Sequence, residues 1–141
     1  MKLPRLPLAV MLALGASATC AGQESRFPDL SDFTRSSTEH QIVVLERSFL
    51  VRSVEGVISF QNEPGERLGD VLFEIEGPGT LRIIRRATTD KDGKFKIRRV
   101  PEGTYRFKTT RDGFNSTVGT IVVSRKAQKD DRIRIEVAVG V

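Results

Sequence analysis

The stretch from Ala87 to Tyr105 constrains the fold of this chain most strongly, because it contains two turn signals roughly ten residues apart. Asp92-Gly93 is the first signal, and Pro101-Glu102-Gly103 is the second. After each turn, apolar and polar residues alternate, which is the period of a β-strand with one buried face. The stretch therefore predicts two strands, each with one face in the core. The residues expected to face inward are Phe95, Ile97, Tyr105 and Phe107. The residues expected to face outward are Lys94, Lys96, Arg98, Thr104, Arg106 and Lys108.

The rest of the chain continues as short apolar or alternating runs separated by turns. These runs predict further strands in the ranges 42–45, 49–51, 54–60, 71–76, 81–86, 120–124 and 132–139. Glycine, proline, asparagine and aspartate mark the turns between them, for example at 61–65 and 77–79. Seven or eight short strands with a turn about every 8–12 residues predict an all-β fold, an antiparallel sandwich or barrel without a convincing helix.

The first 18 residues have the features of a signal peptide. Lys2 and Arg5 form a basic start, Leu6 to Leu14 is a short apolar run, and Ala16-Ser17-Ala18 is a small-residue cleavage site. No later stretch is long and apolar enough to span a bilayer. We therefore expect a secreted or periplasmic protein without a transmembrane segment once residues 1–18 are removed.

Residues 19–40 are polar and show no clear period, so we expect them to form a flexible N-terminal arm. Phe27, Leu30 and Phe33 are spaced three apart, which would fit one short helical turn, but a disordered linker is the preferred interpretation. Residues 41–141 are then expected to form one domain.

Cys20 is the only cysteine, so the chain cannot form an intramolecular disulfide. Because Cys20 lies beside the predicted cleavage site, a lipid anchor through this residue is an alternative to free export. The preceding residues, Ser17-Ala18-Thr19, lack the larger aliphatic and the small residue that lipidation sites usually have at these positions, which favours free export.

A series of short motifs occurs in a particular order along most of the chain. They are Val54-Glu-Gly-Val-Ile-Ser-Phe60, Pro64-Gly65, Leu68-Gly-Asp-Val71, Phe73-Glu-Ile-Glu-Gly77, Thr88-Thr-Asp-Lys-Asp-Gly-Lys-Phe95, Val100-Pro-Glu-Gly-Thr-Tyr105 and Asp112-Gly-Phe114. This order resembles the carboxypeptidase regulatory-like domain, a transthyretin-like (prealbumin-like) β-sandwich. The resemblance implies a Greek-key sandwich and a non-catalytic accessory module, in a superfamily that includes carbohydrate-binding sandwiches. It assigns no functional residues, because the family has no fixed set.

Catalytic relatives of this fold need residues that the chain lacks. Transthyretin-like hydrolases use several histidines and a Tyr-Arg-Gly-type end, whereas this chain has only His40 and ends in Val-Gly-Val141. Similar iron dioxygenases hold the metal with pairs of tyrosine and histidine, whereas Tyr105 is the single tyrosine and is expected in the core. Isopeptide-forming pilin-type sandwiches need a lysine on the first strand, which has none. We therefore expect no enzyme, no catalytic residue and no cofactor.

Asp90 and Asp92 could be considered as calcium ligands. A calcium loop needs more oxygen ligands at close spacing, and Lys91 and Lys94 are unfavourable neighbours. A hairpin turn in which the aspartates accept hydrogen bonds from local backbone N–H groups is the favoured interpretation, so we expect no metal site.

A basic cluster is the main functional signal. Between Leu81 and Arg111 there are eleven lysines and arginines and three acidic residues, a local net charge of +8. Alternation predicts that five basic residues point outward on neighbouring strands: Lys94, Lys96, Arg98, Arg106 and Lys108. We expect these five residues to form a face that could bind an anionic ligand. Like charges opposed across strands cost stability, so an anionic partner is a reasonable hypothesis, the alternative being a solvated face balanced by acidic loops.

The candidate partners are an anionic polysaccharide, lipopolysaccharide, anionic lipid or a protein of the cell envelope. Nucleic acid is disfavoured, because outward aromatic residues for base stacking are scarce. The expected function is an exported, non-enzymatic binding or accessory module for a carbohydrate or another envelope component. The alternative is a structural protein that pairs with an envelope partner through a sheet edge.

Overall fold

A computed structural model describes residues 29–38, 41–63, 65–77 and 84–140. It contains nine strands and, within these residues, no helix: β1 (Ile42–Val44), β2 (Phe49–Val51), β3 (Val54–Phe60), β4 (Leu72–Glu76), β5 (Ile84–Thr88), β6 (Lys94–Ile97), β7 (Gly103–Thr110), β8 (Ser116–Val123) and β9 (Ile133–Val137). The all-β class predicted from the sequence is confirmed.

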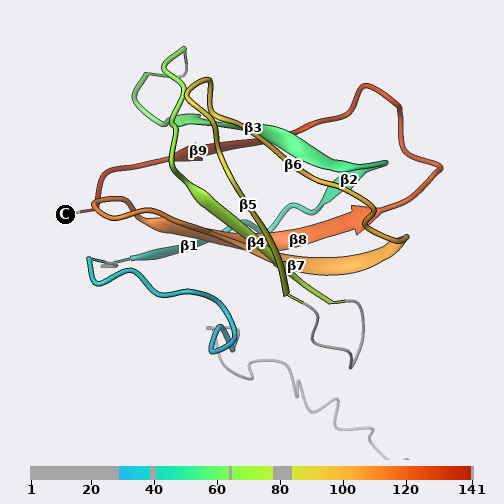
Figure 1. The fold of residues 1–141 in the computed structure, drawn as a ribbon, viewed down its shortest axis with the longest axis horizontal. Helices are drawn as coiled ribbons and strands as arrows, with labels where there is room; N and C mark the ends of the chain where they lie inside the picture. Colours follow the sequence, from blue (N-terminus) through green and yellow to red (C-terminus); the bar gives the residue numbers. More distant parts are fainter. Residues whose placement is uncertain (1–28, 39–40, 64, 78–83, 141) are drawn as a thin grey trace, which may run out of the picture.

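The strands form two sheets that pack face to face as a β-sandwich (Figure 1). The large sheet has the order β1-β8-β7-β4-β5, and β2 also pairs with β8 further along that strand. The small sheet has the order β6-β3-β9. In Figure 1, β3 and β9 lie in the upper layer, and β1, β4, β7 and β8 lie in the lower layer.

Strand pairing is mixed, whereas the sequence predicted an antiparallel sandwich of seven or eight strands. β7 pairs antiparallel with β4 and β8, and β3 pairs antiparallel with β6. β1 and β2 both run parallel to β8, and β9 runs parallel to β3. Alternation identifies which face of a strand is buried, but it contains no information about the direction of the neighbouring strand, which explains the difference.

Aromatic residues from both sheets form the centre of the core. Phe73 of the large sheet stacks on Phe95 of the small sheet, with ring centroids 4.1 Å apart, and on Phe107 at 5.3 Å. Phe73 and Phe107 are fully buried. Ile97 and Tyr105 are buried as well, so the inward set predicted from alternation matches the core.

The first glycine turn is fixed by hydrogen bonds and by backbone geometry. The carboxylate of Asp90 accepts hydrogen bonds from the backbone N–H groups of Asp92 (2.9 Å) and Lys94 (3.0 Å). Gly93 has φ of +70°, and a Cβ at this position would lie 2.4 Å from the carbonyl oxygen of Ile58. Glycine is therefore required here, and the turn holds β6 against β3.

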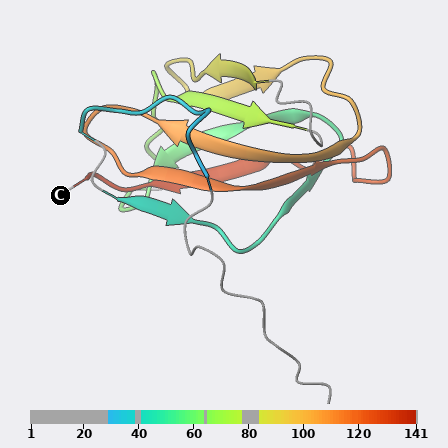
Figure 2. The ribbon, with the colours of Figure 1, turned by 90° about the horizontal axis from the view of Figure 1, so that it is seen from below.

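The N-terminal segment differs from the expected flexible arm in the part that the structure describes. Residues 29–38 lie on the outer face of the large sheet, shown in blue beside β7 and β8 in Figure 2. Phe33 is only 4% exposed, and its backbone N–H donates to the carbonyl of Leu30 in a tight turn. The segment has no sequence period because its hydrogen bonds go to side chains of the sheet, which periodicity does not report.

Candidate functional site

The five basic residues predicted to share one surface are divided between the two sheets. Lys94 and Lys96 lie on β6 of the small sheet, and Arg98 follows this strand directly. Arg106 and Lys108 lie on β7 of the large sheet. Because the outer faces of a sandwich point in opposite directions, these two groups do not form one surface.

Lys108 and Arg106 bind other parts of the domain. Lys108 is 1% exposed, and its Nζ donates to the carbonyl of Thr34 at 2.8 Å. Arg106 forms an ion pair with Glu76 and donates to the carbonyl of Asp29 at 2.8 Å. These two residues anchor the segment 29–38, so their predicted place in an open anionic-ligand face is corrected.

The outer face of the small sheet instead combines β6 with the last strand. Arg132 precedes β9 and Arg134 lies within it, and both are exposed, as are Lys94, Lys96 and Arg98. We call these five residues the basic sheet face: Lys94, Lys96, Arg98, Arg132 and Arg134. The alternation of Arg132 and Arg134 with isoleucines was visible in the sequence, but the parallel pairing of β9 with β3 was not.

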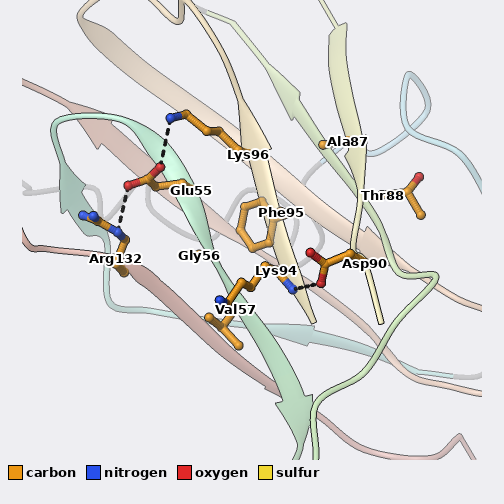
Figure 3. Close-up of a pocket in the computed structure, with 10 residues that line it drawn as sticks. All are labelled: Glu55, Gly56, Val57, Ala87, Thr88, Asp90, Lys94, Phe95, Lys96 and Arg132. Atoms are coloured by element: carbon orange, nitrogen blue, oxygen red, sulfur yellow. Dashed lines mark hydrogen bonds and ion pairs between the residues drawn. The ribbon is translucent and has the colours of Figure 1, made fainter. Parts of the chain in front are cut away.

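The central strand β3 separates the two rows of basic side chains. Glu55 lies between Lys96, with 3.4 Å between Nζ and Oε2, and Arg132, with 2.7 Å between Nε and Oε1 (Figure 3). Val57 lies opposite Lys94 on one side and Arg134 on the other. With Glu55 and Glu136 as the acidic residues at outward positions of these strands, five basic and two acidic side chains leave a net charge of +3.

An open hollow of about 550 Å³ lies on this face. Figure 3 shows Ala87 and Thr88 of β5 beside β6, with Lys94, Lys96 and Arg132 around the hollow. Gly56 and Val57 of β3, together with Phe95, line its floor. Glu55 and Asp90 line the hollow as well, so its three cationic side chains and two carboxylates leave a net charge of +1 above a small apolar floor. This net positive charge favours an anionic group over a cationic one.

The residues weighed for chemistry lie elsewhere or have structural roles. Cys20 and His40 are outside the described residues. The hydroxyl of Tyr105 donates to the carbonyl of Pro101 at 2.7 Å, and burial raises the pKa of this hydroxyl while nearby Arg85 opposes the rise. In the described part of the chain, no three His, Cys, Asp or Glu side chains are grouped so that they could hold a metal ion.

Comparisons with known proteins agree with this fold. The family model for the carboxypeptidase regulatory-like domain matches residues 63–137. A search of curated proteins found no match. In the described ranges, no helix is long and apolar enough to cross a membrane.

Among solved structures, the chain is similar to two dioxygenases. The crystal structure of 3-chlorocatechol 1,2-dioxygenase from Rhodococcus opacus matches with a TM-score of 0.44 and 11% identity, over 71% of this chain and 68% of that chain. Chlorocatechol 1,2-dioxygenase from Pseudomonas putida matches with a TM-score of 0.43 and 10% identity, over 77% and 70%. Both similarities are too distant to bear on activity.

Proposed function

Because this chain belongs to the carboxypeptidase regulatory-like domain family, whose domains are generally non-catalytic, we propose that it is an exported binding or accessory module. Its ligand is an acidic polysaccharide or lipopolysaccharide of the cell envelope, and its binding surface is the basic sheet face. The observation that supports this proposal most directly is the exposure of all five basic side chains of this face on one side of a three-stranded sheet.

The spacing of these side chains suits a polymer with repeated negative charges. Alternate residues on a strand are about 6.6 Å apart, and β6 and β9 are separated by two interstrand spacings, about 9.6 Å. One chain of carboxylates, sulfates or phosphates can therefore contact several cations at once, so that individually weak contacts add up through multivalency. Mobile lysine and arginine side chains adjust to different charge spacings, which favours a polymer over one rigid small anion.

Glu55 restricts where the polymer binds most strongly. It already neutralises part of the charge of Lys96 and Arg132, which lie at one end of the face. At the other end, Lys94 and Arg134 flank the uncharged Val57. We therefore assign the first anionic group of the ligand to the space between Lys94 and Arg134.

Binding to polygalacturonate, to purified lipopolysaccharide and to neutral dextran tests this proposal. The variant Lys94→Gln/Arg98→Gln/Arg134→Gln leaves both ion pairs of Glu55 intact, and we expect it to weaken binding of the two anionic ligands roughly tenfold or more, since three contacts of at least 0.5 kcal/mol each are lost. Raising the salt concentration from about 20 mM to about 200 mM should weaken wild-type binding as well, because the charges are exposed.

The matched control is Arg125→Gln/Lys126→Gln/Lys129→Gln, which removes the same charge from an exposed loop. This control should keep nearly full affinity. Equal losses in the two triple variants would mean that only net charge matters, and equal binding to neutral dextran would mean that charge does not matter. Either result contradicts the proposed surface.

A specific observation favours a second candidate function, in which a protein partner pairs with the edge of the large sheet. Val44 of β1 and Leu50 of β2 are 47% and 51% exposed, and both lie on the edge next to β8. An extended segment of an envelope protein could add to this edge through main-chain hydrogen bonds. Capture of one envelope protein that is lost in Val44→Asp/Leu50→Asp, without any glycan binding, would support this function over the first.

A further inference from the structure

A second open pocket lies at the end of the small sheet where the pairing of β3 with β6 stops. The last residue pair of this ladder is Val54 and Ile97. Beyond it, the segment before β3 and the segment after β6 enclose a volume of about 500 Å³, which we call the β6 pocket. Its polar lining comes from both segments and from the end of β6: Arg52, Ser53, Lys96, Arg98 and Arg99.

The β6 pocket concentrates more positive charge than the other hollows of this side of the molecule. Among the described residues that line it, four are cationic and none is acidic. The hollow between β5 and β3 has a net charge of +1. A cavity of about 380 Å³ beside β1 is lined by one cation, Arg134, and one carboxylate, Glu136. An anionic group is therefore attracted most strongly to the β6 pocket.

Three of its four cations have no carboxylate partner in the described part of the chain. Glu55 forms an ion pair with Lys96, at 3.4 Å, but none with the arginines of the pocket. The Nε of Arg52 donates to the carbonyl of Ala127 at 2.6 Å, which holds this guanidinium in place without using its two terminal nitrogens. Arg98 and Arg99 are exposed, and their side chains form no ion pair with a described residue.

The backbone of Arg99 gives an independent indication of a binding site. Its φ is +57°, in the left-handed region that glycine and asparagine adopt more easily than arginine does. Arg85 of β5 holds the segment in place, because its Nη1 donates to the carbonyl of Arg99 at 2.6 Å. An arginine in a strained conformation beside three like charges is unfavourable for the protein alone, and such strained residues cluster at functional sites.

We propose that the β6 pocket binds a phosphate monoester group of a saccharide. A phosphate monoester has close to two negative charges at neutral pH and three acceptor oxygens, whereas a carboxylate, a sulfate ester or a phosphate diester has one charge. The planar guanidinium groups of three arginines present paired N–H donors that match phosphate oxygens. The inference rests on the proposed function in one respect, since Lys96 and Arg98 also belong to the basic sheet face.

The test compares three sugar probes at pH 7.5: glucose 6-phosphate, glucose 6-sulfate and glucuronate. Backbone amide signals of the full, ¹⁵N-labelled chain report both the affinity and the place of binding. We expect glucose 6-phosphate to bind roughly tenfold more tightly than the two singly charged probes, because its second charge interacts with all four cations. The amide signals of Ser53, Arg99 and Val100 should shift, and that of Ala138, beside β1, should not.

One variant and one matched control locate the site. Arg99→Asn removes a cation and keeps a residue that tolerates positive φ, so it should weaken glucose 6-phosphate binding roughly fivefold without lowering the midpoint of urea unfolding. Lys91→Asn makes the same change of charge in the exposed turn at the other end of β6 and should leave this binding nearly unchanged. Lipopolysaccharide, with and without phosphatase treatment, identifies the source of the phosphate. Weaker binding after treatment would assign the pocket to the envelope ligand, and unchanged binding would assign it to free sugar phosphates.

Two outcomes would overturn the pocket: equal affinity for the three probes, or a preference for glucose 6-phosphate that is undiminished in Arg99→Asn. Either could occur while polygalacturonate still binds the basic sheet face, which would leave the proposed function standing. Conversely, a phosphate preference that depends on Arg99, in a chain that does not bind polygalacturonate or lipopolysaccharide, would support the pocket and contradict the proposed function.

Discussion

At the scale of single residues, the outer face of the large sheet contains charged side chains that are buried by other residues of the same chain. Glu74 is fully buried on β4 and lies opposite Lys108 and Arg86 on the two neighbouring strands. Its Oε1 accepts from the backbone N–H of Thr34 at 2.9 Å, and its Oε2 accepts from the hydroxyl of Thr34 at 3.1 Å. Charges with such partners are expected to be strongly coupled to stability.

Replacing Glu74 tests this expectation. We expect Glu74→Ala to lower the free energy of unfolding by about 3–5 kcal/mol, because hydrogen bonds to a buried charged group contribute about 1.5–3 kcal/mol each and the variant removes both acceptors of Thr34, together with the ion pair to Arg86. Glu74→Gln should cost less, since its amide oxygen still accepts one hydrogen bond. Urea unfolding measures both changes.

Exposed Glu136→Ala is the control for Glu74 and should change stability by less than about 0.5 kcal/mol. A loss for Glu74→Ala as small as that of the control would show that the buried carboxylate contributes no net stability.

At the scale of elements, the sequence allowed the strands to be located but not the packing of the segment before them. Phe95, Ile97, Tyr105 and Phe107 alternate with polar residues, and period two is enough to place them in the core. Residues 29–38 instead bind through one aromatic side chain and a few hydrogen bonds to distant strands. Such contacts leave no repeating pattern, so the segment was expected to be flexible.

Phe33 holds this segment on the sheet. Its ring is buried, and the guanidinium carbon of Arg106 lies 5.8 Å from the ring centroid. We expect Phe33→Ala to release residues 29–38 locally, so that the backbone N–H of Thr34, which donates to Glu74, exchanges with solvent at least tenfold faster. Amide hydrogen exchange followed by NMR measures this rate.

The exchange rates of β7 and β8 residues at the centre of the large sheet provide the control in the same experiment. They should change much less than the rate of Thr34. If all rates rose by the same factor, the segment would be part of the global cooperative unit, and the local release argued here would be wrong.

At the scale of the whole molecule, the candidate site depends on which strands become neighbours. Lys94, Lys96 and Arg98 were placed on one outward face from alternation alone, and they do lie on one exposed row. Across β3, the neighbouring basic residues are Arg132 and Arg134. They are placed there because β9, the last strand, pairs parallel with β3 in the middle of the chain. Long-range pairing of this kind depends on the packing of the complete sandwich, so no local pattern could have identified it.

The position of β9 has a consequence for how the protein is made. This strand completes the small sheet, positions two of the five residues of the basic sheet face (Arg132 and Arg134) and forms one wall of the cavity beside β1. All three features therefore remain absent from a growing chain until residue 137 has been synthesised, however well the earlier strands have paired. Because β3 must wait for a partner more than seventy residues away, the non-local β3–β9 pairing should be among the slowest steps of folding.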